Sequence, residues 1–164
     1  MELSIQVLEK KQNKSEFNCG YTLLDDYLKK QAKQDVHRDL SACFVLVDWF
    51  DCIKGYYTLS ANSIIRKDFP ETLQKKLPPS YQDIPTILLG RLAIDKSVQG
   101  NGYGEILLID ALKRSLNISE SLGTIAVVVA PIDEKAKGFY NRYGFILLPT
   151  SGKMFLPIKT IKEL

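Results

Sequence analysis

Hydrophobic and polar positions alternate along several stretches of this chain, and the period of the alternation predicts the element. A period of two indicates a half-buried strand at residues 3–9, and two runs rich in aromatic and β-branched residues predict a hairpin. The nearly continuous apolar run at residues 86–95 is typical of a strand covered on both faces. The predicted strands span residues 3–9, 42–50, 53–61, 86–95, 124–130, 145–148 and 153–157.

Other stretches follow helical spacing. A short helix can open at Pro70, and a long helix is predicted to run to Leu122, where Gly123 is expected as a left-handed C-cap. Asp133 can cap a further helix that Gly144 ends. The apolar positions are Leu24, Tyr27, Leu28 and Ala32 in the first helix and Leu108, Ile109, Leu112 and Leu116 in the long one.

This order of elements predicts a single α+β domain over residues 1–164, with a mixed central β-sheet flanked by helices. The composition, 45% hydrophobic and 25% charged, is that of a globular protein. No apolar run approaches the ~18 to 20 residues of a membrane span. Glu2 precedes the first apolar residues, unlike the basic start of a signal peptide, so we expect a cytoplasmic protein that does not bind membranes.

The cysteines and the single histidine narrow the possible chemistry. Cys19, Cys43 and Cys52 lack the spacing of a metal site and are expected to be free thiols that pack rather than react. We place Cys43 and Cys52 on the strands of the hairpin. With His37 as the only histidine, a histidine-based triad or a multi-histidine metal site is nearly excluded.

Three glycines stand within the six residues QGNGYG, Gln99 to Gly104, between a buried strand and the long helix. Backbone N–H groups at a helix N-terminus lack intrahelical partners, and glycines let a phosphate approach closely, so this glycine loop is a candidate anion site. Glu105 stands where a dinucleotide fingerprint needs its third glycine, and no Gly-Lys-Ser/Thr triplet follows. Alone, the segment is either a phosphate site or a strand-to-helix turn.

A second motif, GFYNRYGF at residues 138–145, places Tyr140 and Tyr143 on the helix after the second buried strand. If the two buried strands are neighbours, both helices start from the same end of the sheet, and Tyr140 and the glycine loop flank one crevice. The alternative is that these tyrosines are aromatic core.

Together these segments resemble the GNAT N-acetyltransferases, whose pyrophosphate loop follows the pattern Gln/Arg-x-x-Gly-x-Gly/Ala. The resemblance implies a metal-free enzyme that transfers an acetyl group from acetyl-CoA to an amine. It also implies that the preceding strand pairs with the pantetheine arm and that Tyr140 is the general acid. The residues that it assigns to acetyl-CoA are Leu92, Ala93, Ile94, Gln99, Gly100, Asn101, Gly102, Tyr103 and Gly104.

The segments FNCGYTLLDDYLKKQAKQD, LLGRLAID and FYNRYGF are similar to the GNAT toxins of bacterial type II toxin–antitoxin pairs. This narrower resemblance implies a toxin that acetylates the α-amino group of aminoacyl-tRNA and blocks translation. A ribbon–helix–helix antitoxin is then the expected protein partner, and we expect a homodimer. Two other functions stay open, namely a GNAT enzyme for a small-molecule or peptide amine and a non-catalytic acyl-CoA-binding module.

The basic residues allow two interpretations. The net charge of +3 does not by itself indicate nucleic-acid binding, and clustered lysines are often a solvated face. If the substrate is tRNA, Lys33, Arg38 and Arg66 are candidates to contact its phosphates. Arg91 lies within an apolar strand, so it forms either a structural ion pair or a contact with the acceptor end of tRNA.

Overall fold

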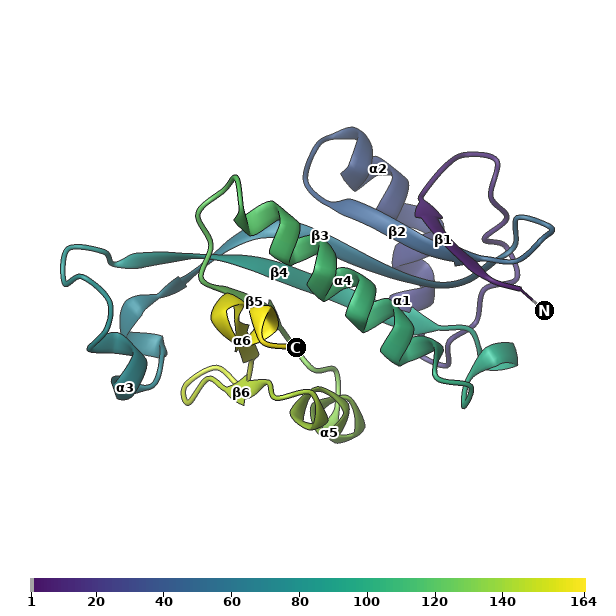
Figure 1. Ribbon diagram of the computed structural model, residues 1–164. Helices are drawn as coiled ribbons and strands as arrows, with labels where there is room; N and C mark the ends of the chain where they lie inside the picture. Colours follow the sequence, from purple (N-terminus) through teal and green to yellow (C-terminus); the bar gives the residue numbers. More distant parts are fainter. Residues whose placement is uncertain (1) are drawn as a thin grey trace. The chain divides into compact units, whose positions relative to one another are not determined.

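The computed structural model describes residues 2–164, which form two compact units. Unit 1 holds residues up to 60 and 89–111, and unit 2 holds 61–88 and 112–164. Among the described residues, seven strands form one sheet in the order β1-β2-β3-β4-β5-β7-β6 (Figure 1). The strands are β1 (Ser4–Val7), β2 (Ala42–Val47), β3 (Ile53–Ile65), β4 (Asp83–Ile94), β5 (Ala126–Val129), β6 (Ile146–Leu147) and β7 (Met154–Pro157).

The part of the chain that the structure describes also contains α-helices, one π-helical segment and two 3-10 segments. The α-helices are α1 (Thr22–Asp26), α2 (Ala32–His37), α3 (Glu71–Gln74), α4 (Tyr103–Ser119), α5 (Glu134–Arg142) and α6 (Ile158–Lys162). A π-helical segment, η1 (Tyr27–Gln31), joins α1 to α2. The 3-10 segments are η2 (Arg66–Asp68) and η3 (Lys96–Val98). Within residues 2–164, no helix combines the length and the apolar character that crossing a membrane requires.

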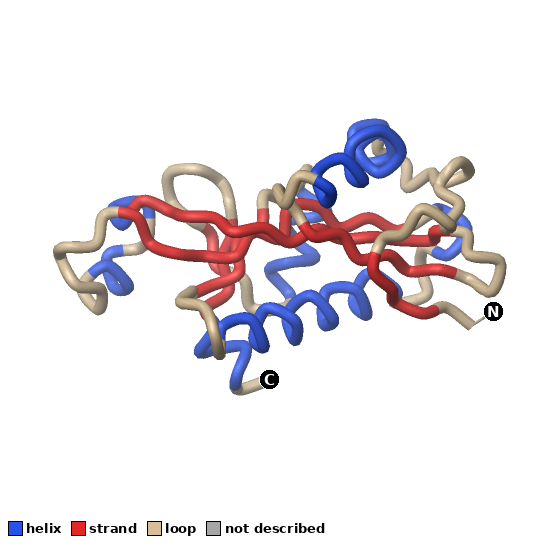
Figure 2. The backbone as a smooth tube through the Cα atoms, turned by 90° about the horizontal axis from the view of Figure 1, so that it is seen from above, coloured by secondary structure: helices blue, strands red, loops and turns tan. Residues whose placement is uncertain are grey.

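In unit 1 the predicted hairpin is confirmed, because β2 and β3 pair antiparallel. Cys43 and Val45 on one face of β2 belong to the buried cluster that includes residues of η1. On the other face, Phe44 stacks on Tyr57 at 5.2 Å, and the Tyr57 hydroxyl donates to Asp110 of α4 at 2.5 Å. Figures 1 and 2 show α1–α2 and the first half of α4 on opposite faces of these strands.

A glycine allows α4 to pack closely on β3. A Cβ added to Gly55 would lie 2.9 Å from Ile94 Cδ1 and 3.1 Å from both Leu107 Cδ1 and the Ala93 carbonyl oxygen. Any side chain at this position would displace the helix or the neighbouring strand.

The helix predicted around Leu24 and Tyr27 is confirmed, and Tyr27, Leu28 and Ala32 are its buried residues. The sequence does not predict its π-helical turn, in which the Ala32 N–H donates to the Tyr27 carbonyl. The Tyr56 hydroxyl of β3 donates to the Leu24 carbonyl at 2.7 Å, just before η1. Such π-helical turns are frequent at functional sites.

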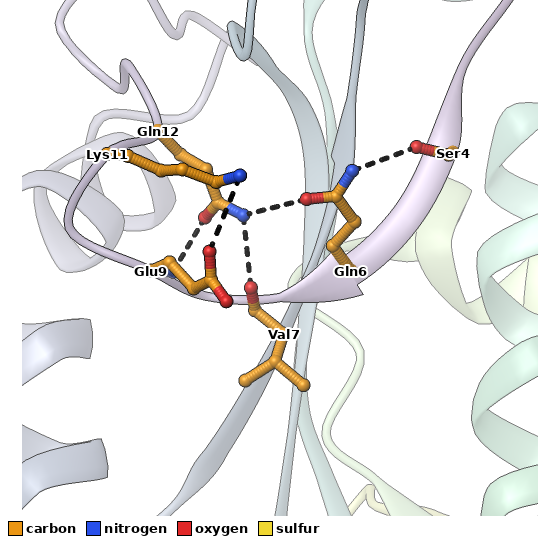
Figure 3. Close-up of polar contacts among 6 residues, drawn as sticks. All are labelled: Ser4, Gln6, Val7, Glu9, Lys11 and Gln12. Carbon is orange, nitrogen blue, oxygen red and sulfur yellow. Dashed lines mark hydrogen bonds and ion pairs between the residues drawn. The ribbon is translucent and has the colours of Figure 1, made fainter.

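The loop after β1 is held by a buried glutamine (Figure 3). The Gln12 side chain accepts from the Glu9 N–H at 2.8 Å and donates to the Val7 carbonyl at 3.0 Å and to Gln6 Oε1 at 3.4 Å. These bonds stabilise the path of the chain beside β1.

Unit 2 has its own core. Every residue of β5 is buried, and β5 and β6 each pair antiparallel with β7. Phe69 packs edge-on against Phe155 at 5.3 Å. The predicted capping of α5 is confirmed, because Asp133 accepts from the Ala136 N–H at 2.8 Å and Gly144 has a φ of 92°.

Several predictions for these elements are wrong. Gly123 is not a left-handed cap, because α4 ends at Ser119 and the Leu122 N–H still donates to the Ile118 carbonyl at 3.0 Å. Backbone hydrogen bonds in this tightened last turn pair the last helical carbonyls, so no glycine in the left-handed conformation is needed. The strand predicted to be covered on both faces is only half-buried at residue 88, over residues 90–92 and at residue 94. The sequence does not predict α6.

Candidate functional site

The glycine loop has a backbone that only glycine adopts readily. Gly100 and Gly102 each have a φ of 82°, in the left-handed region. A Cβ added to either residue would meet nothing within 4 Å, so the conformation, and not lack of space, requires glycine. The open surroundings leave room for a ligand beside the loop.

The loop leads directly into the N-terminus of α4, which is 17 residues long. The Ile106 N–H donates to the Gly102 carbonyl at 3.1 Å. The N–H groups of the first helical turn have no partner within the helix, and the helix dipole adds partial positive charge. The arrangement therefore fits the phosphates of a nucleotide cofactor.

Backbone amides are the candidate binding groups at the glycine loop. Among residues 2–164, no group of three or more His, Cys, Asp or Glu side chains could hold a metal ion. The ligand expected at the glycine loop is anionic, and backbone amides are sufficient to bind it.

Side chains fix the path of the glycine loop. Gln99 Nε2 donates to the Ile94 carbonyl at 2.8 Å and to the Cys19 carbonyl at 3.0 Å. Asn101 Nδ2 donates to the Val98 carbonyl at 3.1 Å and to the Gln99 carbonyl at 3.4 Å. Gln99 and Asn101, both predicted to bind the cofactor, thus use their amides to shape the loop.

Asp95, directly after β4, was not singled out from the sequence and is 7% exposed. Its carboxylate accepts from the Ser97 N–H at 3.0 Å, from the Ser97 hydroxyl at 2.5 Å and from the Asn18 N–H at 2.8 Å. Burial alone would raise the pKa of Asp95, but these hydrogen bonds and the charge of Lys54 together lower it. The signal in the sequence is an aspartate at the end of an apolar run, a residue type that is favoured at the N-cap of a helical turn.

The strand residues predicted to bind the pantetheine arm lie just before this loop in unit 1. Ala93 is buried, and Leu92 and Ile94 are half-buried. Strand β4 and the glycine loop thus form one continuous segment. All nine residues predicted to bind acetyl-CoA lie on it, between Leu92 and Gly104.

Tyr140, the predicted general acid, lies near the end of α5 in unit 2. Its ring is 7% exposed and lies 5.2 Å from those of Phe139 and Phe145, between centroids. Burial raises the pKa of the Tyr140 hydroxyl above its usual range, so the phenol keeps its proton at neutral pH.

The cysteines have little of the character of nucleophiles. Burial, with a smaller contribution from the Asp25 carboxylate, raises the pKa of Cys19 to about 11. Burial likewise raises the pKa of Cys43 to about 12, against a weaker opposing effect of Arg91. Both thiols are therefore protonated at neutral pH and unreactive. Cys52 lies just before β3 and not on the strand as predicted. Its backbone forms an isolated β-bridge with Asn13.

The four predicted tRNA-contacting residues lie in different settings. Lys33 and Arg38 are exposed, in α2 and directly after it. In unit 2, the Arg66 guanidinium donates to the Gln74 carbonyl at 2.7 Å and so caps the C-terminal end of α3. Whether it also contacts a phosphate stays a prediction.

Arg91 is half-buried on β4, and its guanidinium carbon lies 3.4 Å from the ring centroid of Tyr27. Such a cation–π contact stabilises the charge within an apolar strand. The Tyr27 hydroxyl donates to Asp35 at 2.7 Å, and Tyr27 also stacks on Tyr56 at 6.3 Å between centroids. Arg91 is therefore held against an aromatic pair that is itself fixed.

A strand that runs into a glycine-rich loop at the start of a helix fits the phosphates of an acyl-CoA, as expected for an acyl-CoA-dependent transferase. The model of the acetyltransferase (GNAT) family matches residues 13–145, and the chain belongs to this family. It is an N-acetyltransferase that uses acetyl-CoA, which confirms the predicted α+β fold, enzyme class and cofactor.

The toxin branch of the family supplies close relatives. The tRNA-acetylating toxin of Mycobacterium tuberculosis strain H37Rv is 35% identical over 138 residues, which cover 82% of this chain and 78% of the relative. The crystal structure of a KacT mutant is 36% identical, with a TM-score of 0.93 over 99% of both chains. AtaT complexed with acetyl-methionyl-tRNAfMet is 31% identical, with a TM-score of 0.91 over 99% of this chain and 98% of AtaT. Other structures hold AtaTR with AcCoA, and mutant AtaT with the C-terminus of the antitoxin AtaR.

Proposed function

We propose that the protein acetylates the α-amino group of aminoacyl-tRNA and thereby blocks translation, as the toxin of a type II toxin–antitoxin pair. The observation that carries this proposal is the similarity, over almost the whole chain, to AtaT in complex with an acetylated aminoacyl-tRNA. We also propose a cytoplasmic location, which agrees with charged tRNA as the substrate. A ribbon–helix–helix antitoxin is the proposed partner, supported by the AtaT–AtaR complex, and we also propose a homodimer.

The acceptor amine needs little help from the enzyme. A free α-amino group titrates at about 7.7 to 8.0, and an adjacent ester lowers this pKa further because it withdraws electrons. Neutral amine is therefore abundant at cellular pH, and a strong general base is unnecessary. This agrees with a chain whose single histidine, His37, is exposed at the end of α2.

Bound acetyl-CoA supplies the acetyl group as a thioester. In the proposed mechanism, the amides of the glycine loop and the first turn of α4 bind its phosphates. Backbone N–H groups of Leu92–Ile94 stabilise negative charge on the thioester oxygen. The neutral amine nitrogen bonds to the carbonyl carbon and the carbon–sulfur bond breaks, while Tyr140 donates its proton to the departing sulfur. The proton that the amine nitrogen loses restores the Tyr140 phenol by way of solvent, so the products are the amide and the CoA thiol. No covalent cysteine intermediate is involved.

Basic residues of unit 1 are proposed to hold the tRNA. Lys33 and Arg38 are exposed and available to phosphates. Arg91 is proposed to bind the acceptor end, since the Tyr27 ring covers one face of its guanidinium and leaves the donors at its edge to face a ligand.

A reconstituted translation system of purified components tests this function. The protein with acetyl-CoA is expected to arrest synthesis of a reporter, whereas the protein with CoA alone is not, because no acetyl group can be transferred. Purified protein with Tyr140→Phe serves as the matched control. Arrest that needs no acetyl-CoA, or no arrest when acetyl-CoA is present, would contradict the proposal.

A further inference from the structure

Residues 77 to 80 positions apart in the chain meet at the base of the glycine loop. The Asn18 N–H donates to Asp95 Oδ1 at 2.8 Å, and the Lys96 N–H donates to the Asn18 carbonyl at 2.8 Å. Gln99 Nε2 donates to the Cys19 carbonyl at 3.0 Å. The segment Phe17–Gly20 is thus bonded to both ends of η3, the turn that leads into the glycine loop.

The Phe17–Gly20 segment is itself fixed in the core of unit 1. Phe17 is 1% exposed and packs edge-on against Tyr56, with ring centroids 5.7 Å apart. Cys19 is 5% exposed, and its N–H donates to Asp25 Oδ1 at 2.9 Å. Gly20 has a φ of 99°, and a Cβ there would come within 3.2 Å of Lys96 Cε. The segment is therefore a rigid support.

We propose that the Phe17–Gly20 segment, Asp95 and Gln99 form a clamp that holds the glycine loop in its phosphate-binding shape before acetyl-CoA arrives. Asp95 and Gln99 are then positioning residues, which act through the loop backbone and not by contact with the cofactor. A loop that is already ordered loses less conformational freedom on binding, so the clamp increases affinity for acetyl-CoA. This role follows from hydrogen bonds within unit 1 and does not depend on the identity of the acceptor.

The decisive variant is Gln99→Met, which keeps the length of the side chain and removes both donors. We expect affinity for CoA, measured by calorimetry, to fall about 10-fold, the loss expected for two partly exposed hydrogen bonds. Gln99→Arg restores donors for the same two carbonyls and should recover most of the affinity. Asp95→Asn has a single acceptor oxygen and cannot accept from both the Asn18 N–H and Ser97, so it should weaken binding in the same direction.

The matched control is Gln12→Met, because Gln12 also donates to a backbone carbonyl in unit 1 but holds the loop after β1 (Figure 3). It should lower the midpoint of thermal unfolding and leave the affinity for CoA unchanged. In steady-state assays Gln99→Met should raise KM for acetyl-CoA and leave kcat unchanged, since the loop does not touch the reacting atoms. A folded Gln99→Met protein with wild-type affinity, or equal losses in Gln12→Met, would overturn the clamp. Calorimetry with CoA tests the clamp even if charged tRNA is not the acceptor.

Discussion

At the scale of single residues, the motifs predict Tyr140, Gln99 and the glycines as site residues, but not the contacts that support the glycine loop. Gly100 and Gly102 adopt the left-handed backbone that glycine permits. The supporting role of Gln99 could not be predicted, because one of its partners is the Cys19 carbonyl, 80 residues away. The capping contact of Arg66 depends in the same way on how the chain folds back after α3.

Tyr140→Phe tests the proposed general acid. The substitution deletes one hydroxyl and opens almost no cavity, so affinity for acetyl-CoA and thermal stability should stay near wild type. The rate of acetyl transfer should fall ~10²- to 10⁴-fold, the usual value of general acid catalysis. Tyr143→Phe removes a hydroxyl from the adjoining turn and is the control. A wild-type rate in Tyr140→Phe, or an equal loss in Tyr143→Phe, would assign Tyr140 to the core alone.

At the scale of elements, the period of hydrophobic residues predicted the strands and helices, whereas details set by tertiary contacts were missed. Beside the π-helical turn at Tyr27, the Tyr56 hydroxyl of β3 donates to the Leu24 carbonyl, a contact that no local pattern contains. Gly123 was mistaken for a cap because glycine after a helical run usually is one, although here backbone bonds close the helix earlier.

The region of α2 is predicted to bind tRNA phosphates. Replacement of Lys33 and Arg38 by alanine should weaken binding of charged tRNA and reduce the dependence of log K on log salt concentration by about 2, roughly one for each phosphate that is no longer neutralised. Arg66 is left intact because it ties down α3. The matched control replaces Lys159 and Lys162, two exposed lysines on α6, and should keep the wild-type slope. An unchanged slope in the α2 variant would exclude these residues as phosphate contacts.

At the scale of the whole molecule, the order of elements was sufficient to predict an α+β fold, and the resemblance of two short motifs to the GNAT family implied acetyl-CoA as the cofactor. Both predictions are confirmed by the family to which the chain belongs. The acceptor could not be derived in this way, because a mild net charge of +3 fits several amines. Its assignment to charged tRNA rests on relatives similar along nearly the whole chain.

The most direct test of that assignment is to follow the acetyl group itself. Acetyl-CoA labelled in the acetyl group is offered to the protein with charged tRNA, deacylated tRNA and a panel of polyamines. We predict label on charged tRNA only, released as N-acetyl amino acid when mild base cleaves the ester, because the α-amino group is the proposed acceptor. Label on polyamines and none on charged tRNA would leave the acetyltransferase fold intact and contradict the proposed block of translation.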